Sequence, residues 1–385
     1  MANIAIASED NNYRVCRRCI MDTTDPQIRF NADGICNHCL KYEVDIHTKV
    51  HKRELADARL KEKIDDIKRA GQGKQYDCIL GISGGVDSTY VAYLARKWGL
   101  RPLAVHFDNG WNSEIAVTNI EYALKKLDID LYTYVVEWDE FRDLQLAFLR
   151  ASIQNAEIPT DHGIAAILFQ SAIKFKVRYI LTGDNIATEA ILPDSWAHSY
   201  WDYRLIQSIH KEFGRVPLKT FPRLPFRRML YYRYIRPIER VCILDYVPYV
   251  KNEAIELLKK ELGWQSYGGK HCESVFTRFF QSYILPNKFK FDKRRAHLSS
   301  LICSEQISRD QALEELKRDP YDSRMMQSDK EYVAKKLGIT LREFEQIMAL
   351  PIRTYRDYPS DHFLLSGGKE ILNWVRWARY RLVHR

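Results

Sequence analysis

The sequence lacks the features that mark membrane-bound or exported proteins. No apolar run approaches the roughly 18 residues that a membrane-spanning helix needs. The first stretch, MANIAIASEDNNYR, has neither a basic region nor an apolar core, so we expect no secretion signal. No internal repeat or low-complexity tract is visible. These absences predict a cytoplasmic protein without a membrane partner.

The composition is that of a globular protein. With 385 residues, of which 46% are hydrophobic, the chain can form one large or two smaller cores. Lys and Arg number 59 against 50 Asp and Glu, which gives a formal net charge of +9. This charge suits phosphorylated or otherwise anionic substrates, but alone it does not indicate nucleic acid, which we do not expect as a partner.

Four of the eight cysteines form two close pairs. Cys16 and Cys19 are followed, after sixteen intervening residues, by Cys36 and Cys39. In a chain without an export signal this spacing favours metal over disulfides and predicts a zinc-ribbon module at residues 14–42. A four-thiolate zinc site has no open position, so we expect it to be structural. The alternative is that these cysteines are buried or redox-active.

The chain after this module divides into three further regions. Residues 43–75 are heavily charged, with a sparse apolar stripe, and predict a helical linker that ends near Gly71. Residues 76–300 alternate apolar strand patterns with helical ones, which predicts an α/β fold with an open parallel sheet. Within this region, residues 190–236 interrupt the alternation of strand and helix patterns, which indicates an insertion. Residues 301–385 predict a C-terminal helical region.

A glycine-rich turn lies between the first predicted strand, 78–82, and the helix behind it. Adjacent glycines let the backbone approach a ligand, and the free N–H groups of the first helical turn bind anions. An acidic residue in such a loop makes sense if a divalent cation bridges it to phosphates. We therefore predict a phosphate site here, against the alternative of an ordinary turn, at Ser83, Gly84, Gly85, Asp87 and Ser88.

Polar residues follow two other predicted strands. Asp108 follows the strand at 102–107, while Gly183, Asp184 and Glu189 follow the strand at 178–182. Ligands of open parallel sheets bind at the carboxyl ends of strands, so these residues are candidates for nucleotide and magnesium binding. The alternatives are a simple turn at Asp108 and a solvated helix start at Glu189. His162, at a predicted helix start, is a further candidate for contact with nucleotide or substrate.

Two later segments carry cations. Lys270 and His271 follow two glycines, a combination suited to neutralising pyrophosphate as it leaves; the alternative is a solvated turn. The insertion is rich in aromatic residues and arginine, so we expect it to cover the site and to bind a sugar and a diphosphate. A partner interface is an equal alternative for the insertion.

The loop SGGVDS resembles the pyrophosphate loop (PP-loop) of the ATP pyrophosphatase superfamily. The resemblance implies that ATP is cut between its α and β phosphates, and that a substrate oxygen is adenylylated. It also implies that Asp108 lies by the adenosine and that Asp87 and Glu189 bind Mg²⁺. The segment Arg236-Pro237-Ile238 resembles one that many such enzymes place beside the phosphates.

The order of CRRC…CNHC, SGGVDS, VHFDNGW, PTDHGI, LTGDNIATE, YGGKHCES and DKRRAHLSSLI resembles the N-acetyl sugar amidotransferase family of WbpG and PseA type. The resemblance covers roughly residues 14–320. It implies conversion of an acetamido group on a nucleotide-activated N-acetyl sugar into an acetamidino group, in lipopolysaccharide or nonulosonic acid biosynthesis. Ammonia would come from a separate glutaminase subunit through a cyclase-like partner. The absence of a GxCxG-like elbow agrees with an external ammonia source.

The main alternative is a tRNA-modifying sulfur transferase with the same loop and a zinc module. That activity usually needs a pair of catalytic cysteines near the nucleotide, whereas Cys242, Cys272 and Cys303 are single and scattered. A nucleotide-binding scaffold without enzymatic activity is a third possibility, which ATP turnover would exclude.

Overall fold

The computed structural model describes residues 13–49, 53–266 and 273–366. Its centre is a sheet with the strand order β3-β2-β1-β4-β5, in which every neighbouring pair is parallel. The strands are β1 (Cys78–Gly81), β2 (Pro102–Asp108), β3 (Asp130–Val135), β4 (Tyr179–Thr182) and β5 (Glu239–Cys242). The first four agree with the predicted strands, and β5 is an addition that the sequence did not indicate.

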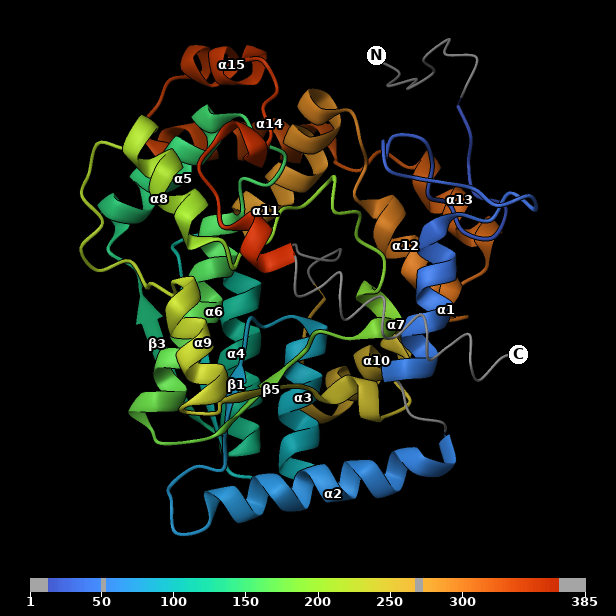
Figure 1. Ribbon diagram of the computed structural model, residues 1–385, viewed down its shortest axis with the longest axis vertical. Helices are drawn as coiled ribbons and strands as arrows, with labels where there is room; N and C mark the ends of the chain where they lie inside the picture. The colour runs from blue at the N-terminus through green and yellow to red at the C-terminus, as the bar shows by residue number, and fades with distance from the viewer. Residues whose placement is uncertain (1–12, 50–52, 267–272, 367–385) are drawn as a thin grey trace.

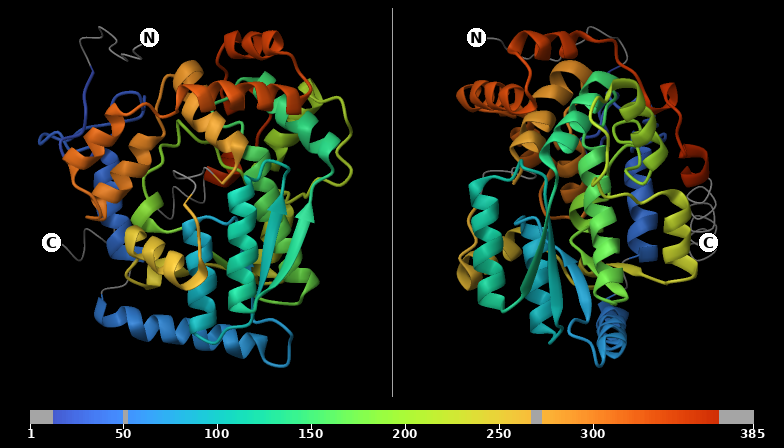
Figure 2. Two further views of the ribbon diagram at one scale, coloured as in Figure 1. Left: turned by 180° about the vertical axis from the view of Figure 1, so that it is seen from behind. Right: turned by 90° about the vertical axis from the view of Figure 1, so that its left-hand side faces the viewer.

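Helices cover both faces of the sheet (Figures 1 and 2). On one face, α3 (Val86–Lys97), α4 (Glu114–Leu127) and α10 (Lys251–Leu262) share one apolar cluster with the strands. On the other face lies α6 (Ile158–Lys174), and α5 (Trp138–Ala151) packs against α8 (Tyr203–Phe213) farther out. The charged helix α2 (Arg53–Gly71) runs beneath the sheet and ends at the predicted glycine.

The chain after the sheet is helical. Its elements are α11 (Val275–Phe279), the π-helical η2 (Phe280–Phe289), α12 (Arg294–Cys303), α13 (Arg309–Lys317), α14 (Ser323–Leu337), α15 (Leu341–Ala349) and η3 (Tyr355–Asp357). Four further elements precede them: α1 (Asn37–Lys49), α7 (Ile186–Glu189), α9 (Phe226–Tyr234) and η1 (Ile243–Tyr246). The open parallel sheet, the helical C-terminal region and the N-terminal cysteine cluster confirm the predicted fold class. Among the described helices, none is long and apolar enough to cross a membrane.

Candidate functional site

The glycine-rich turn forms a compact loop between β1 and α3. The hydroxyl of Ser88 accepts a hydrogen bond from the backbone N–H of Ser83 at 3.2 Å, and the two serine hydroxyls lie 3.3 Å apart. Helix α3 begins after Gly85 without a side chain capping its first turn. Uncapped N–H groups at a helix N-terminus, with hydroxyl donors beside them, form a site for phosphate oxygens.

Gly84 adopts a backbone conformation that suits only glycine. Its φ is +80°, and a Cβ at this position would lie 2.4 Å from the carbonyl oxygen of Ala116 on α4. The buried indole of Trp264 donates a 2.9 Å hydrogen bond to the Gly84 carbonyl. The loop is therefore held from both sides, by α4 and by the segment that follows α10.

The loop opens into a cavity of about 580 Å³ at the carboxyl ends of the strands. This cavity brings together seven residues that the sequence singled out: Ser83, Gly85, Asp87, Ser88, Gly183, Asp184 and Glu189. Gly183 lets the end of β4 approach the first turn of α3, since a Cβ there would lie 3.0 Å from backbone atoms of Asp87 and Ser88. Residues separated by about a hundred positions thus meet at one edge of the sheet, as parallel topology requires.

Asp108 lies at this edge but does not line the cavity. Its carboxylate accepts hydrogen bonds from the N–H of Gly110 at 2.9 Å and from the amide of Asn112 at 3.0 Å, which fixes the turn after β2. The residues of this turn that line the cavity are Asn109 and Asn112. His106, also in the lining, contacts the Ile82 carbonyl oxygen at 2.9 Å and Asn112 at 3.0 Å.

Carboxylates are concentrated where the cavity meets α3, α6 and α7. Tyr249 donates a short hydrogen bond to Asp87, and burial together with the charges of Asp87 and Glu189 raises the pKa of the tyrosine. Burial and the neighbouring Glu157 raise the pKa of Asp161 to about 7. Two carboxylates beside the glycine-rich loop, within a surplus of negative charge, fit a divalent cation; Asp87 and Glu189 would be its ligands.

Sequence reasoning did not assign a role to Asp161, which lies in the first turn of α6. The helix begins at Ile158, so Asp161 is not its N-cap. Lys251 and Lys293 are cations in the cavity lining, the second from the DKRRAH segment. Lys270 and His271 lie outside the described residues. The described residues on either side, Ser266 and Glu273, both line the cavity.

His162 has a structural place. It is buried; its Nδ1 lies 2.7 Å from the Tyr200 carbonyl oxygen, and its Nε2 accepts a 3.1 Å hydrogen bond from the N–H of Leu224. Burial lowers the pKa of His162 to about 4, so the ring is neutral and donates through Nδ1. The histidine therefore connects α6 to two points of the insertion and does not line the cavity.

The insertion is only partly at the site. Residues 191–201 contribute to a second cavity beside the first, while α8 packs on α5 and α9 packs on α6. The expectation that Arg236-Pro237-Ile238 lies beside the phosphates is wrong. These residues precede β5, which runs parallel to β4, so they lie at the opposite end of the sheet from the loop. The arginine of this strand that lines a cavity is Arg240.

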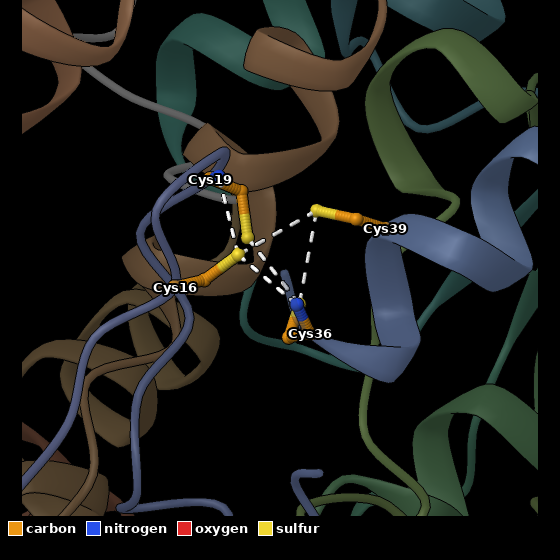
Figure 3. Close-up of side chains that lie close together, drawn as sticks. All are labelled: Cys16, Cys19, Cys36 and Cys39. Atoms are coloured by element: carbon orange, nitrogen blue, oxygen red, sulfur yellow. Dashed lines mark hydrogen bonds between the residues drawn. The ribbon is translucent and has the colours of Figure 1, made fainter. Parts of the chain in front are cut away.

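The four predicted cysteines meet in one buried cluster (Figure 3). Their sulfur atoms all lie within 4.8 Å of one another. The sulfur–sulfur distance is 3.6 Å for Cys19–Cys36, 3.7 Å for Cys36–Cys39 and 3.9 Å for Cys16–Cys39. Sulfur atoms on a tetrahedral zinc ion, with bonds of about 2.3 Å, stand about 3.8 Å apart. The cluster therefore has the size for one tetrahedral metal ion.

The cysteine module supports the helix that reaches the site. The N–H of Ile20 donates to the Ser299 hydroxyl on α12 at 3.2 Å, and Arg309 donates to the backbone oxygens of Cys16 and Cys19. Lys293, in the cavity lining, immediately precedes α12. The cysteine module thus contacts the helix that directly follows this lysine of the cavity wall.

The C-terminal part of the chain is similar to a known protein family. Residues 273–375 match the family model described as "LPS biosynthesis protein WbpG-like, C-terminal domain", which confirms the resemblance inferred from the sequence for that part of the chain. The matched region includes Glu273, Ser274, Thr277, Gln281 and Lys293 of the cavity lining. No curated protein matches the chain in sequence.

Several solved structures resemble it at low identity. NMN synthetase from Francisella tularensis has 12% identity, a TM-score of 0.32 and coverage of 77% of this chain and 98% of its own. The U34-tRNA thiolase NcsA from Methanococcus maripaludis has 16% identity, a TM-score of 0.30 and coverage of 66% and 80%. NH3-dependent NAD synthetase from Campylobacter jejuni has 15% identity, a TM-score of 0.26 and coverage of 53% and 83%.

Proposed function

We propose that the chain is an ATP-dependent amidotransferase of lipopolysaccharide biosynthesis, which converts the acetamido group of a nucleotide-activated N-acetyl sugar into an acetamidino group. The observation that carries the proposal is the SGGVDS loop at the uncapped start of α3, facing a cavity rimmed by carboxylates. The match of residues 273–375 to the WbpG-like C-terminal domain supports the biosynthetic context.

An amide is a poor electrophile because its nitrogen donates electrons into the carbonyl group. In the proposed first step the amide oxygen attacks the α-phosphorus of ATP, an O–P bond forms, and the bond to the β-phosphate breaks with loss of pyrophosphate. The N–H groups and serine hydroxyls of the loop bind the departing phosphates. Asp87 and Glu189 would hold Mg²⁺, which when bound offsets phosphate charge.

In the second step ammonia adds to the activated carbon, and AMP leaves with the former amide oxygen. The attacking nitrogen loses a proton as the C–O bond breaks, and the product is an amidine. Asp161 has a pKa of about 7, which suits a carboxylate that accepts this proton near neutral pH. No side-chain nucleophile is needed.

We also propose that ammonia is supplied by a glutaminase acting through a cyclase-like subunit. Ammonia in water is mostly protonated at neutral pH, and only the neutral form is a nucleophile. Supplied alone with ATP and acceptor, the chain should use high ammonium but not glutamine. Addition of the two partners should restore use of glutamine; comparable glutamine use by the isolated chain would contradict the two-partner arrangement.

The sulfur-transferase alternative requires thiols at the nucleotide. In the part of the chain that the structure describes, no cysteine lines the first cavity. Cys242 contacts Thr182 at 3.9 Å, and Cys303 lies 3.7 Å from Cys39 in the metal module. This arrangement favours ammonia over a protein-bound sulfur as the nucleophile.

The test is product analysis with ATP, Mg²⁺, ammonium and a panel of nucleotide-linked N-acetyl sugars. AMP and pyrophosphate should form in equal amounts, only when an acceptor is present, together with an amidine that mass spectrometry detects. Release of ADP and orthophosphate, or AMP formation that depends on tRNA and not on a sugar, would contradict the proposed function.

A further inference from the structure

A second cavity, of about 360 Å³, lies directly beside the first. Its size falls within the roughly 300–1,000 Å³ of small-molecule pockets. The two cavities share part of their lining: Asp161, Ile164, Leu168, Asp184, Glu189 and Lys293. They are therefore two chambers of one site, and molecules bound in each would meet at this shared wall.

The shared wall contains the groups that the proposed chemistry uses. Asp161 and Glu189 face both chambers, and the charge of Lys293 acts on Asp161. Lys293 also lines both chambers. A cation between two chambers can neutralise negative charge on a ligand in either of them.

Beyond the wall, the second chamber has an arginine of fixed orientation. Arg240 on β5 donates from Nη1 to the Tyr200 hydroxyl at 2.8 Å and from Nη2 to Asp184 at 2.7 Å. Burial alone would lower the pKa of Arg240, but Tyr200 and Asp184 raise it, so the guanidinium stays charged. These contacts use two of the five donors of an arginine side chain and hold the group in place for an anion.

The chamber also has an aromatic wall. Trp201 packs edge-on against Phe169 with ring centroids 6.0 Å apart, and lies 4.9 Å from the ring of Tyr200. The hydrogen bond from His162 Nδ1 to the Tyr200 carbonyl oxygen fixes the backbone of Tyr200. Indole and phenyl rings offer large apolar surfaces of fixed orientation, against which the C–H face of a pyranose ring packs. The chamber thus combines one apolar surface with cationic groups, as a site for an anionic sugar requires.

We propose that this second chamber binds the acceptor, an N-acetylated sugar that carries a phosphate or other anionic group. The sugar ring packs on Trp201, Arg240 bonds the anionic group, and the acetamido oxygen points across the shared wall toward the α-phosphate in the first chamber. This inference rests on the proposed function and adds to it the location of the acceptor and the residues that bind it.

The experiment measures the KM for the acceptor and, separately, the affinity for a non-hydrolysable ATP analogue. Trp201→Ala and Arg240→Gln should raise the acceptor KM about tenfold or more, with analogue affinity unchanged. Trp201→Phe, which retains an aromatic ring, should recover much of the loss. Matched controls are Tyr234→Ala and Arg236→Gln, at exposed positions away from both chambers, which should leave both quantities unchanged. Thermal unfolding establishes that each variant is folded.

Three results separate the possibilities. If the wild-type chain forms AMP with an acceptor but these variants weaken only the ATP analogue, the assignment of the second chamber is wrong and the proposed function stands. If no acceptor supports AMP formation, the proposed function itself is wrong. Comparison of one acetamido sugar in free, phosphorylated and nucleotide-linked form tests the anion: equal KM values for all three would contradict the role of Arg240.

Discussion

The indole Nε1 of Trp264 lies 2.9 Å from the carbonyl oxygen of Gly84, 180 positions away in the sequence. This hydrogen bond fixes the middle of the glycine-rich loop from the segment after α10. The same segment is held to α4, because Asn119 both donates to and accepts from the backbone of Gln265. The loop is thus positioned by tertiary contacts as well as by its own glycines.

Replacement of Trp264 by Phe tests this support, because it retains an apolar ring and removes the donor. We expect a loss of about 1 kcal/mol in the free energy of unfolding. The KM for ATP should rise roughly fivefold, while the acceptor KM stays constant. Steady-state kinetics with each substrate varied in turn provide the check. An equal rise in both KM values would show a general loss of structure instead.

Gly84→Ala should abolish most of the activity because its Cβ would collide with the carbonyl oxygen of Ala116. Displacement of the loop by about 1 Å should lower kcat/KM by roughly a hundredfold. Gly73→Ala is the matched control: its φ of +73° is similar, but nothing lies within 4 Å of the added methyl group. Both variants should lose about 1 kcal/mol of stability to backbone strain. Equal activity in the two would contradict a steric role for Gly84.

The neutral state of His162 predicts a dependence of stability on pH. Its pKa is about 4 in the folded chain against an ordinary value of 6.5, so the unfolded chain binds the proton more tightly. Stability from this residue is complete above about pH 6.5 and decreases as the pH falls toward 4, by about 3 kcal/mol in total. Denaturant unfolding between pH 7 and 4.5 should show this slope in the wild type and a flatter one in His162→Gln. Identical slopes would contradict a neutral buried histidine.

The cysteine cluster should bind one metal ion per chain, and we expect zinc. Cys19→Ser should lose the metal and reduce stability, because the module no longer supports α12. Cys303→Ser is the control: its sulfur lies 3.7 Å from Cys39 but outside the group of four, so it should retain one ion. Elemental analysis of unchelated protein distinguishes these outcomes. Absence of metal, or iron with sulfide, would contradict the prediction of zinc.

Local sequence patterns were sufficient for most of the sheet and for the loop. Four strands are apolar runs between turn residues, and SGGVDS is a contiguous motif. The fifth strand, Glu239–Cys242, is short, begins with two charged residues and directly follows the aromatic, arginine-rich insertion, so no apolar run identified it. Because this strand runs parallel to β4, Arg236 precedes it and lies at the end of the sheet opposite the loop, whereas Arg240 within the strand lines the second cavity.

The rest of the site depends on contacts between distant segments. Asp161 acquires its raised pKa from burial and from the carboxylates around it, none of which is a neighbour in the sequence except Glu157. The pairing of Arg240 with Asp184 requires β4 and β5 to be adjacent. Periodicity and spacing contain no information about such pairs, so the second chamber could be inferred only from the structure.

Transfer of oxygen from the sugar amide to AMP is the central claim, and an isotope measurement tests it most directly. The acceptor is prepared with a heavy oxygen isotope in its acetamido group and incubated with ATP, Mg²⁺, ammonium and the chain. AMP should then carry one labelled oxygen on its phosphate, and the amidine should carry none. Asp87→Asn should form no labelled AMP, although it binds the acceptor normally. Label that stays in the sugar, or that appears in pyrophosphate or orthophosphate, would contradict adenylylation of the amide.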